Sequence, residues 1–325
     1  MSFGNRRRFG AAIAAGLLAT GLARALRAQP QKVGRLVIGF GAGNPFDALA
    51  RRLAESLRLA LAMPLIVENR PGAGGAIAAE VLKSAPADGS VIWLSPLSTL
   101  VTEPVLSKVR YDPVKDFAPV SRVATFDIAL AVGPAAPAKT LAEYVGLVRK
   151  DSSKGFFGTP APNSLPHFFG ILVGKAARVE MTNVSFHGIS GAITATLGGQ
   201  TPAIVSGLGD LIAMHQAGKL RVLATSGPGR SPFLPEVPTF KESGYAIEGT
   251  SWFGILVPAT TPREVVMRVN RAVTSALASQ ELVEYLRTGG LEPAPSTPEA
   301  FAEIIKRDIE FWGNAIRASG VKLGH

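Results

Sequence analysis

Residues 36–47 contain the pattern that decides the expected fold, and they read Leu36-Val37-Ile38-Gly39-Phe40-Gly41-Ala42-Gly43-Asn44-Pro45-Phe46-Asp47. The apolar run at the start is typical of a short buried strand, and the glycines that follow it end the strand. After Asp47, leucines recur at helical spacing, as Leu49, Leu53, Leu57 and Leu61. The stretch therefore predicts a strand, a glycine loop and a helix in succession.

The same alternation of strands and helices continues toward the C-terminus. We expect strands at residues 65–67 and 91–94, a helix from Ala76 to Ser84, and a hydroxyl-rich loop at residues 95–99. Strands that alternate with helices through short loops indicate βαβ units. An α/β fold with a largely parallel sheet is therefore expected in this part of the chain.

The pattern restarts near residue 130, which predicts a second lobe. A strand is expected at residues 128–132, and Thr140 with Glu143 forms the capping-box pattern of a helix start. Further strands are expected at residues 155–158, 184–186, 203–205, 220–224 and 253–257. The length of 325 residues, more than the roughly 150 of a typical domain, agrees with two lobes.

Two helices are expected at the C-terminal end. The first has Thr261, Pro262 and Glu264 as N-cap, first helical residue and capping-box acid. The second starts at Thr297-Pro298 and carries a stripe of apolar residues, namely Phe301, Ile304, Ile305, Trp312 and Ile316. Such a stripe has to pack against a core.

The N-terminus has the composition of an export signal. Residues 1–28 combine five arginines and no acid with an apolar stretch from Gly10 to Ala23, and small residues give cleavage points near Ala25 or Ala28. The apolar stretch is shorter than the roughly 20 residues of a membrane-spanning helix. The residues Arg6-Arg7-Arg8-Phe9 fit a twin-arginine signal and an arginine-rich Sec signal equally well. We therefore expect a periplasmic protein, and half of the formal charge of +10 belongs to the signal rather than to a nucleic-acid surface.

The sequence lacks the common motifs of enzymes and cofactor sites. It has no cysteine, and its four histidines stand at no metal-ligand spacing. Neither glycine loop carries a complete dinucleotide or P-loop signature, and no Gly-x-Ser-x-Gly motif is present. We expect no metal, no cofactor and no nucleic-acid partner, while Ser164 with His167 leaves a secreted serine-type hydrolase as the enzyme alternative.

Three loops offer groups that bind anions. The glycine loop before Asp47 presents backbone N–H groups at a helix N-terminus, where the helix dipole favours negative charge. Hydroxyl groups follow the third strand at residues 95–99 and stand again in the loop at residues 158–167. The alternative is that the glycines only form a tight turn and that Asp47 only caps the helix. Because α/β proteins bind ligands at the carboxyl ends of their strands, the three loops together favour a small anion held between two lobes.

At this level of detail the sequence resembles the Bug family, the extracytoplasmic receptors of tripartite tricarboxylate transporters. The resemblance extends over nearly all of the chain after the signal. Its most specific segments are residues 67–75, beginning Val67-Glu68-Asn69-Arg70, residues 111–120, beginning Tyr111-Asp112-Pro113, residues 197–200, 217–221 and 234–239, and Ser251-Trp252-Phe253-Gly254.

The resemblance implies a two-lobed periplasmic-binding-protein clamshell of type II. One lobe would consist of residues 29–130 and 253–325, and the other of residues 131–252. It also implies a monomer that captures a small carboxylate without metal or cofactor and passes it to a membrane permease. The ligand contacts it implies are Phe40, Gly41, Ala42, Gly43, Asn44, Asp47, Ser95, Ser98, Thr99, Gly158, Thr159, Ser164, His167 and Ser206.

One departure from the family pattern bears on the ligand. Where the family commonly has two glycines in the first loop, this chain has Gly43-Asn44 followed by Pro45-Phe46. Phe46 would make one wall of the site apolar, which favours an aromatic or aliphatic monocarboxylate over a dicarboxylate such as succinate. A receptor for a membrane signalling partner remains an alternative to transport, whereas a DNA-binding regulator is disfavoured because no helix-turn-helix precedes Leu36.

Overall fold

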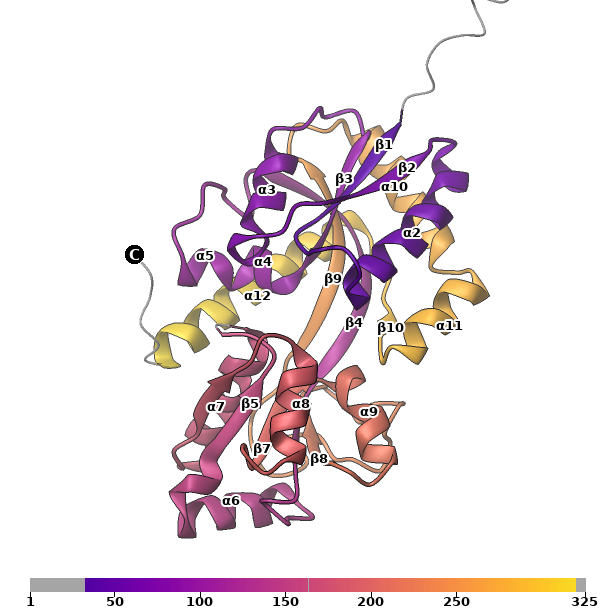
Figure 1. The fold of residues 1–325 in the computed structure, drawn as a ribbon. Coiled ribbons are helices and arrows are strands. Elements are labelled where there is room, and N and C mark those ends of the chain that lie inside the picture. The colour runs from indigo at the N-terminus through magenta and orange to yellow at the C-terminus, as the bar shows by residue number, and fades with distance from the viewer. Residues whose placement is uncertain (1–32, 163, 320–325) are drawn as a thin grey trace, which may run out of the picture. The chain divides into compact units, whose positions relative to one another are not determined.

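The computed structural model describes residues 33–162 and 164–319. The predicted export signal at residues 1–28 lies outside the described residues. Among the described helices, none is both long and apolar enough to cross a membrane. From Gly34 onward the described residues belong to one unit, whose sheet and helices are shown in Figure 1.

The first part of this unit alternates strands and helices, as the sequence predicts. Its elements are β1 (Gly34–Ile38), α2 (Pro45–Leu61), β2 (Leu65–Asn69), the 3-10 helix η1 (Ala73–Gly75), α3 (Ala76–Lys83), β3 (Val91–Pro96), α4 (Leu97–Val101) and α5 (Glu103–Leu106). β1 pairs in parallel with both β2 and β3, which confirms the βαβ units. The prediction of a loop at residues 95–99 is wrong, because β3 continues to Pro96 and α4 follows at once. The helix forms here since Leu97, Leu100 and Val101 are buried together on one face.

Two long strands join the first part of the sheet to the second (Figure 1). β4 (Phe117–Val132) and β9 (Thr250–Pro258) pair antiparallel with each other, and β9 also pairs antiparallel with β3. The whole sheet is therefore mixed rather than largely parallel. Only residues 128–132 of β4 were predicted as strand, because Pro119 and the polar residues after it interrupt the apolar pattern. The pairing with β9 shifts register twice in that segment.

The second part contains α6 (Leu141–Lys150), the 3-10 helix η2 (Ser152–Gly155), β5 (Phe156–Thr159), α7 (Leu165–Ala177), β6 (Thr182–Ser185), α8 (Ile189–Leu197), β7 (Ala203–Gly207), α9 (Leu208–Gln216) and β8 (Arg221–Thr225). β5 pairs in parallel with β6 and β7, while β7 and β8 pair antiparallel with β4. The predicted start of α6 is confirmed, since Thr140 Oγ1 accepts a hydrogen bond from the Glu143 N–H at 3.1 Å. The Glu143 carboxylate in turn accepts from the Lys139 N–H at 2.7 Å.

Three helices follow β9, where the sequence predicted two: α10 (Arg263–Ala276), α11 (Gln280–Thr288) and, after the short strand β10 (Glu292–Pro293), α12 (Pro298–Ser319). α11 is a separate helix because Ser279 caps its start, accepting from the Leu282 N–H. The predicted cap of α10 is wrong by one residue. Pro262 has an extended backbone (ψ 141°) and is itself the N-cap, and the buried Thr261 hydroxyl has no hydrogen-bond partner among the described residues.

Helices cover both faces of the first part of the sheet. Along β1, Leu36 and Ile38 point to the face packed by α2 and α10, while Val37 points to the opposite face. That opposite face is packed by α3, α4 and α12, and the predicted stripe of α12 packs there, with all of its residues buried except the half-buried Ile304. This alternation follows from the two-residue period of a strand. The loop between β1 and α2 lies on the side of the first part that faces α8 and α9 (Figure 1).

Candidate functional site

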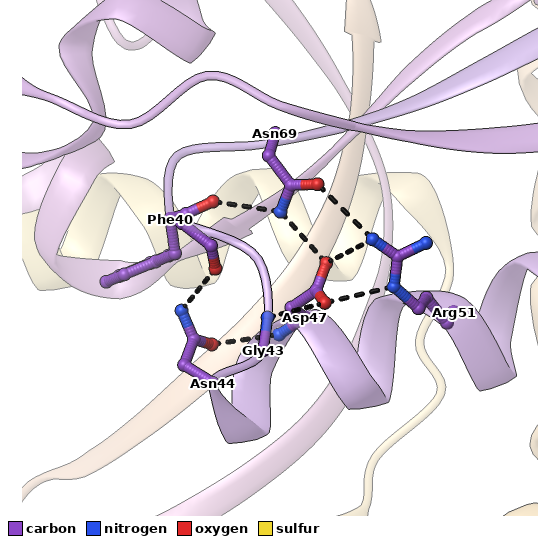
Figure 2. Close-up of polar contacts among 7 residues, drawn as sticks. Phe40, Gly43, Asn44, Asp47, Arg51 and Asn69 are labelled. Carbon is purple, nitrogen blue, oxygen red and sulfur yellow. Dashed lines mark hydrogen bonds and ion pairs between the residues drawn. The ribbon is translucent and has the colours of Figure 1, made fainter.

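The loop between β1 and α2 is exposed and held in one conformation by its own side chains (Figure 2). Gly43 has φ +85°, in the left-handed region that favours glycine. Asn44 is the N-cap of α2: its Oδ1 accepts from the Asp47 N–H at 2.9 Å, and its Nδ2 donates to the Gly41 carbonyl at 2.7 Å. Pro45 follows as the first helical residue. The sequence therefore fixes the loop locally through glycine, cap and proline.

The Asp47 carboxylate is the centre of this loop. The side chain is buried, and it accepts hydrogen bonds from the Gly43 N–H at 3.0 Å, from Arg51 Nε at 3.0 Å and from Asn69 Nδ2 at 2.9 Å. Asn69 Nδ2 also donates to the Phe40 carbonyl at 3.0 Å, so β2 is tied to the same loop (Figure 2). The Arg51 guanidinium, the Gly43 N–H and the Asn69 amide together lower the pKa of Asp47 to about 2.

We predict that Asp47 contributes to acid sensitivity. Its pKa is lower in the folded protein than in the unfolded chain, so its stabilising effect is complete above about pH 4 and is lost as the pH falls toward 2. The free energy of unfolding of Asp47→Asn should therefore fall less steeply between pH 4 and 2 than that of the wild type, as measured by urea denaturation. Glu264→Gln, at an exposed acid on α10, is the control. Parallel pH profiles for wild type and Asp47→Asn would contradict the prediction.

The network leaves only some of the loop amides open. The Gly43 N–H, expected to face a ligand, donates to Asp47 instead, and the N–H groups of Asp47 and Ala48 bond to Asn44. Among the described residues, no acceptor is hydrogen-bonded to the N–H of Gly41, Ala42, Asn44 or Phe46. These four donors surround the N-terminus of a 17-residue helix, where partial positive charge gathers. The loop can therefore accept an anion.

Of the residues expected after β3, Thr99 contacts the second glycine loop, at residues 71–75, rather than the first. Thr99 is fully buried, and its Oγ1 donates to the Gly74 carbonyl at 2.8 Å. A Cβ built on Gly75 would lie 2.5 Å from Thr99 Oγ1, and one built on Gly39 would lie 2.7 Å from the Gly75 Cα. Ser95 is also fully buried, while Ser98 is half-buried at the start of α4. These contacts bring together the end of β1, the second glycine loop and the start of α4, and they occupy the Thr99 hydroxyl.

The residues expected at 158–167 form a separate group around β5. Thr159 is fully buried and donates to Asn183 Oδ1 at 2.7 Å, and Gly158 packs beneath Phe186. Ser164 is the N-cap of α7, and its hydroxyl donates to the Ala161 carbonyl at 2.8 Å. His167 stacks on Phe168, and burial lowers its pKa. The single hydroxyl hydrogen of Ser164 is therefore directed at a backbone carbonyl.

Ser206 lies at the end of β7, and its hydroxyl donates to Asp210 Oδ2 at 2.5 Å. Ser206 is fully buried, whereas the residue Asp210, in the first turn of α9, is exposed as a whole. Its carboxyl group is nevertheless shielded by the surrounding protein, and this desolvation raises the pKa of Asp210. Sequence reasoning missed Asp210, as it missed Arg51 and Asn69. Asn69 belongs to a family-like segment and could have been found there, but the sequence around Asp210 carries no signal.

Four phenylalanine rings form a continuous series that we call the aromatic run, made of Phe40, Phe46, Phe253 and Phe126. The centroids of successive rings are 4.9 Å, 4.7 Å and 5.0 Å apart. Phe46 is buried, and the other three rings are partly exposed. The run leads from the first loop through β9 to β4, next to the end of β7. Within the described residues, no group of three or more acidic or histidine side chains could hold a metal.

The exposed loop lies at the carboxyl end of β1, which is where open α/β sheets bind their ligands. A family model described as the tripartite tricarboxylate transporter family receptor matches residues 49–321. The chain belongs to this family, whose members are solute-binding receptors.

Individual relatives agree with that assignment. A UPF0065 protein of Bordetella bronchiseptica is 32% identical over 284 residues, which are 87% of this chain and 84% of the relative. Among solved structures, the Rhodopseudomonas palustris protein Rpa4515 with adipate has a TM-score of 0.79 at 28% identity, covering 90% of this chain and 98% of the other. The periplasmic binding protein BugD has a TM-score of 0.76 at 28% identity, covering 90% and 99%. The resemblance to the Bug family is therefore confirmed.

Proposed function

We propose that this chain captures a small organic carboxylate in the periplasm and delivers it to a membrane permease of the tripartite tricarboxylate type. The export signal would be cleaved near Ala25 or Ala28. Residues 29–130 and 253–325 would form one lobe and residues 131–252 the other, and the receptor would act as a monomer without metal or cofactor. The observation that carries the proposal is the exposed loop after β1 with its open backbone N–H groups.

A carboxylate suits these donors for a physical reason. Hydrogen bonds to a charged group contribute roughly 1.5–3 kcal/mol each. Three or four of them, less the cost of association, give binding in the micromolar range, about −8 kcal/mol. Groups of the second part, such as those near Ser206, would add contacts only when the two parts close on the ligand. Such differential contacts would shift the population toward the closed form.

The comparisons support the ligand class. The similar Rpa4515 structure contains adipate, which carries two carboxylates. A second similar structure, MatC from Rhodopseudomonas palustris, has bound malate at 26% identity and a TM-score of 0.76, covering 88% of this chain and 99% of the other. Neither ligand is carried over to this chain, whose Phe46 and aromatic run make the surroundings of the loop more apolar. A receptor that delivers its ligand to a signalling protein would use the same loop.

A thermal-shift screen of residues 29–325 against organic acids tests the proposal. A carboxylate at 100 times its dissociation constant should stabilise the folded protein by roughly 2.7 kcal/mol. Gly43→Ala should reduce the shift, because alanine is strained at φ +85° and the loop amides would move. Gly218→Ala is the matched control, since Gly218 has φ +67° and open space but lies after α9. A shift with a neutral sugar or a metal, and none with any carboxylate, would overturn the ligand class.

A further inference from the structure

We propose that the ligand is a monocarboxylate with an aromatic body and a hydrogen-bond donor at its far end, and that Asp210 recognises this donor. The inference rests on the proposed function, because it takes the loop after β1 as the site of the carboxylate. It goes further in assigning the body of the ligand to the aromatic run and the far end to the space beside Gly207.

The aromatic run starts at the loop itself. The ring of Phe40, which is 37% exposed, lies within the same segment as the open amides and contacts Phe46, which contacts Phe253. The rings meet at tilted or edge-to-face angles, as aromatic side chains prefer. Phe40, Phe253 and Phe126 each expose part of their ring, and the buried Phe46 joins Phe40 to Phe253, so apolar side chains extend from the loop toward β4.

The far end of the run lies beside Gly207, where the absence of a side chain leaves room for about one methyl group. A Cβ built on Gly207 would lie 3.5 Å from Phe126 Cδ2 and 3.5 Å from Asp210 Oδ2. The Phe126 ring and the Asp210 carboxylate thus border the same small space at Gly207. Gly207 itself is only partly buried. Any larger side chain at position 207 would occupy that space.

The Asp210 carboxylate can accept a further hydrogen bond. Asp210 Oδ2 accepts from the buried Ser206 hydroxyl at 2.5 Å, and no described donor is hydrogen-bonded to Oδ1. Burial raises the pKa of Asp210, and the hydrogen bond from Ser206 opposes that shift. In its ionised form the carboxylate accepts hydrogen bonds only, so it favours a hydroxyl or amino group over a second carboxylate. The same geometry therefore selects for a donor and against a dicarboxylate of matching length.

The experiment compares three acids that differ only at the far end: benzoate, 4-hydroxybenzoate and terephthalate. A second series, of phenylacetate, 4-hydroxyphenylacetate and 4-carboxyphenylacetate, uses longer acids to cover a greater distance between the loop after β1 and Asp210. Binding to residues 29–325 is measured by isothermal titration calorimetry. In at least one series, the hydroxylated acid should bind at least tenfold more tightly than the unsubstituted acid, and the dicarboxylate should bind most weakly.

Two variants locate the effect. Asp210→Asn should remove most of the advantage of the hydroxylated acid and leave the unsubstituted acid within about threefold. Gly207→Ala, whose methyl group fits at ordinary contact distance, should weaken only the hydroxylated acid, by at least tenfold. Glu180→Gln, at an exposed acid in the second part, should change none of the affinities. The melting temperature of each variant without ligand shows that it is folded.

The outcomes separate the inference from the proposed function. If the dicarboxylate binds most tightly, or if the hydroxyl group gives no advantage in either series while some carboxylate binds, the inference is wrong and carboxylate capture stands. Equal weakening of all acids by Asp210→Asn would also overturn it. If no carboxylate binds at all, both the inference and the proposed function fail.

Discussion

Phe46→Ala is expected to lower the free energy of unfolding by about 3–5 kcal/mol, the range found when a buried phenylalanine is truncated. The Phe46 side chain is only 9% exposed, and its ring contacts both Phe40 and Phe253. Its removal would leave a cavity between α2 and β9. The backbone cannot move in to fill this cavity, because the Asn44 cap holds the start of α2 and strand pairing holds β9. The measurement is urea denaturation at neutral pH.

Phe311→Ala is the matched control for Phe46→Ala. Phe311 also takes part in an edge-to-face aromatic pair, with Trp312 at 5.0 Å between centroids, but it is 44% exposed. Only the pair interaction, at most about 1.5 kcal/mol, should be lost there. Equal losses in the two variants would mean that Phe46 is not part of the buried core.

The strand, loop and helix at residues 34–61 could be predicted because every determinant is local. The apolar alternation, the Asn44 cap and Pro45 all lie within a dozen residues of one another. The first eleven residues of β4 could not, since what makes them a strand is pairing with β9, more than a hundred residues away. α11 was missed for a similar reason: with nine residues it is short, and its apolar side packs on other elements.

In the candidate site, too, the contacts within one segment could be predicted and the contacts between distant segments could not. Asp47 was identified as a cap or a ligand contact, but its carboxylate accepts the Gly43 N–H because Arg51 and Asn69 hold it there. Asn69 arrives from β2, and only the parallel pairing of β1 with β2 places it beside the loop. The surroundings of Asp210 depend on still more distant parts of the sequence, because the Phe126 ring on the other side of Gly207 belongs to β4. All the ligand contacts named from the sequence, in both parts, stay predictions.

Gly209→Ala is expected to lower the free energy of unfolding by about 1–3 kcal/mol or more, as overpacking does. Gly209 lies in the first turn of α9, and a Cβ built on it would overlap the carbonyl oxygen of Gly289, just after α11. The reverse contact is also too close for a side chain, because a Cβ on Gly290 would lie 2.5 Å from the Gly209 Cα. Since both sides are backbone, no side-chain rotation can relieve the overlap.

The overlap would be relieved by moving α9 away from α11. α9 packs with β7 and β8, whereas α11 packs with α2 and β10, so the contact joins the two parts that β4 and β9 connect. Small-angle X-ray scattering of Gly209→Ala should therefore give a larger radius of gyration than the wild type, with unchanged helix content by circular dichroism. Gly229→Ala, whose Cβ would meet nothing within 4 Å, should match the wild type in both measurements. If Gly209→Ala scatters like the wild type and keeps its stability, the contact between α9 and the end of α11 does not set the spacing of the two parts.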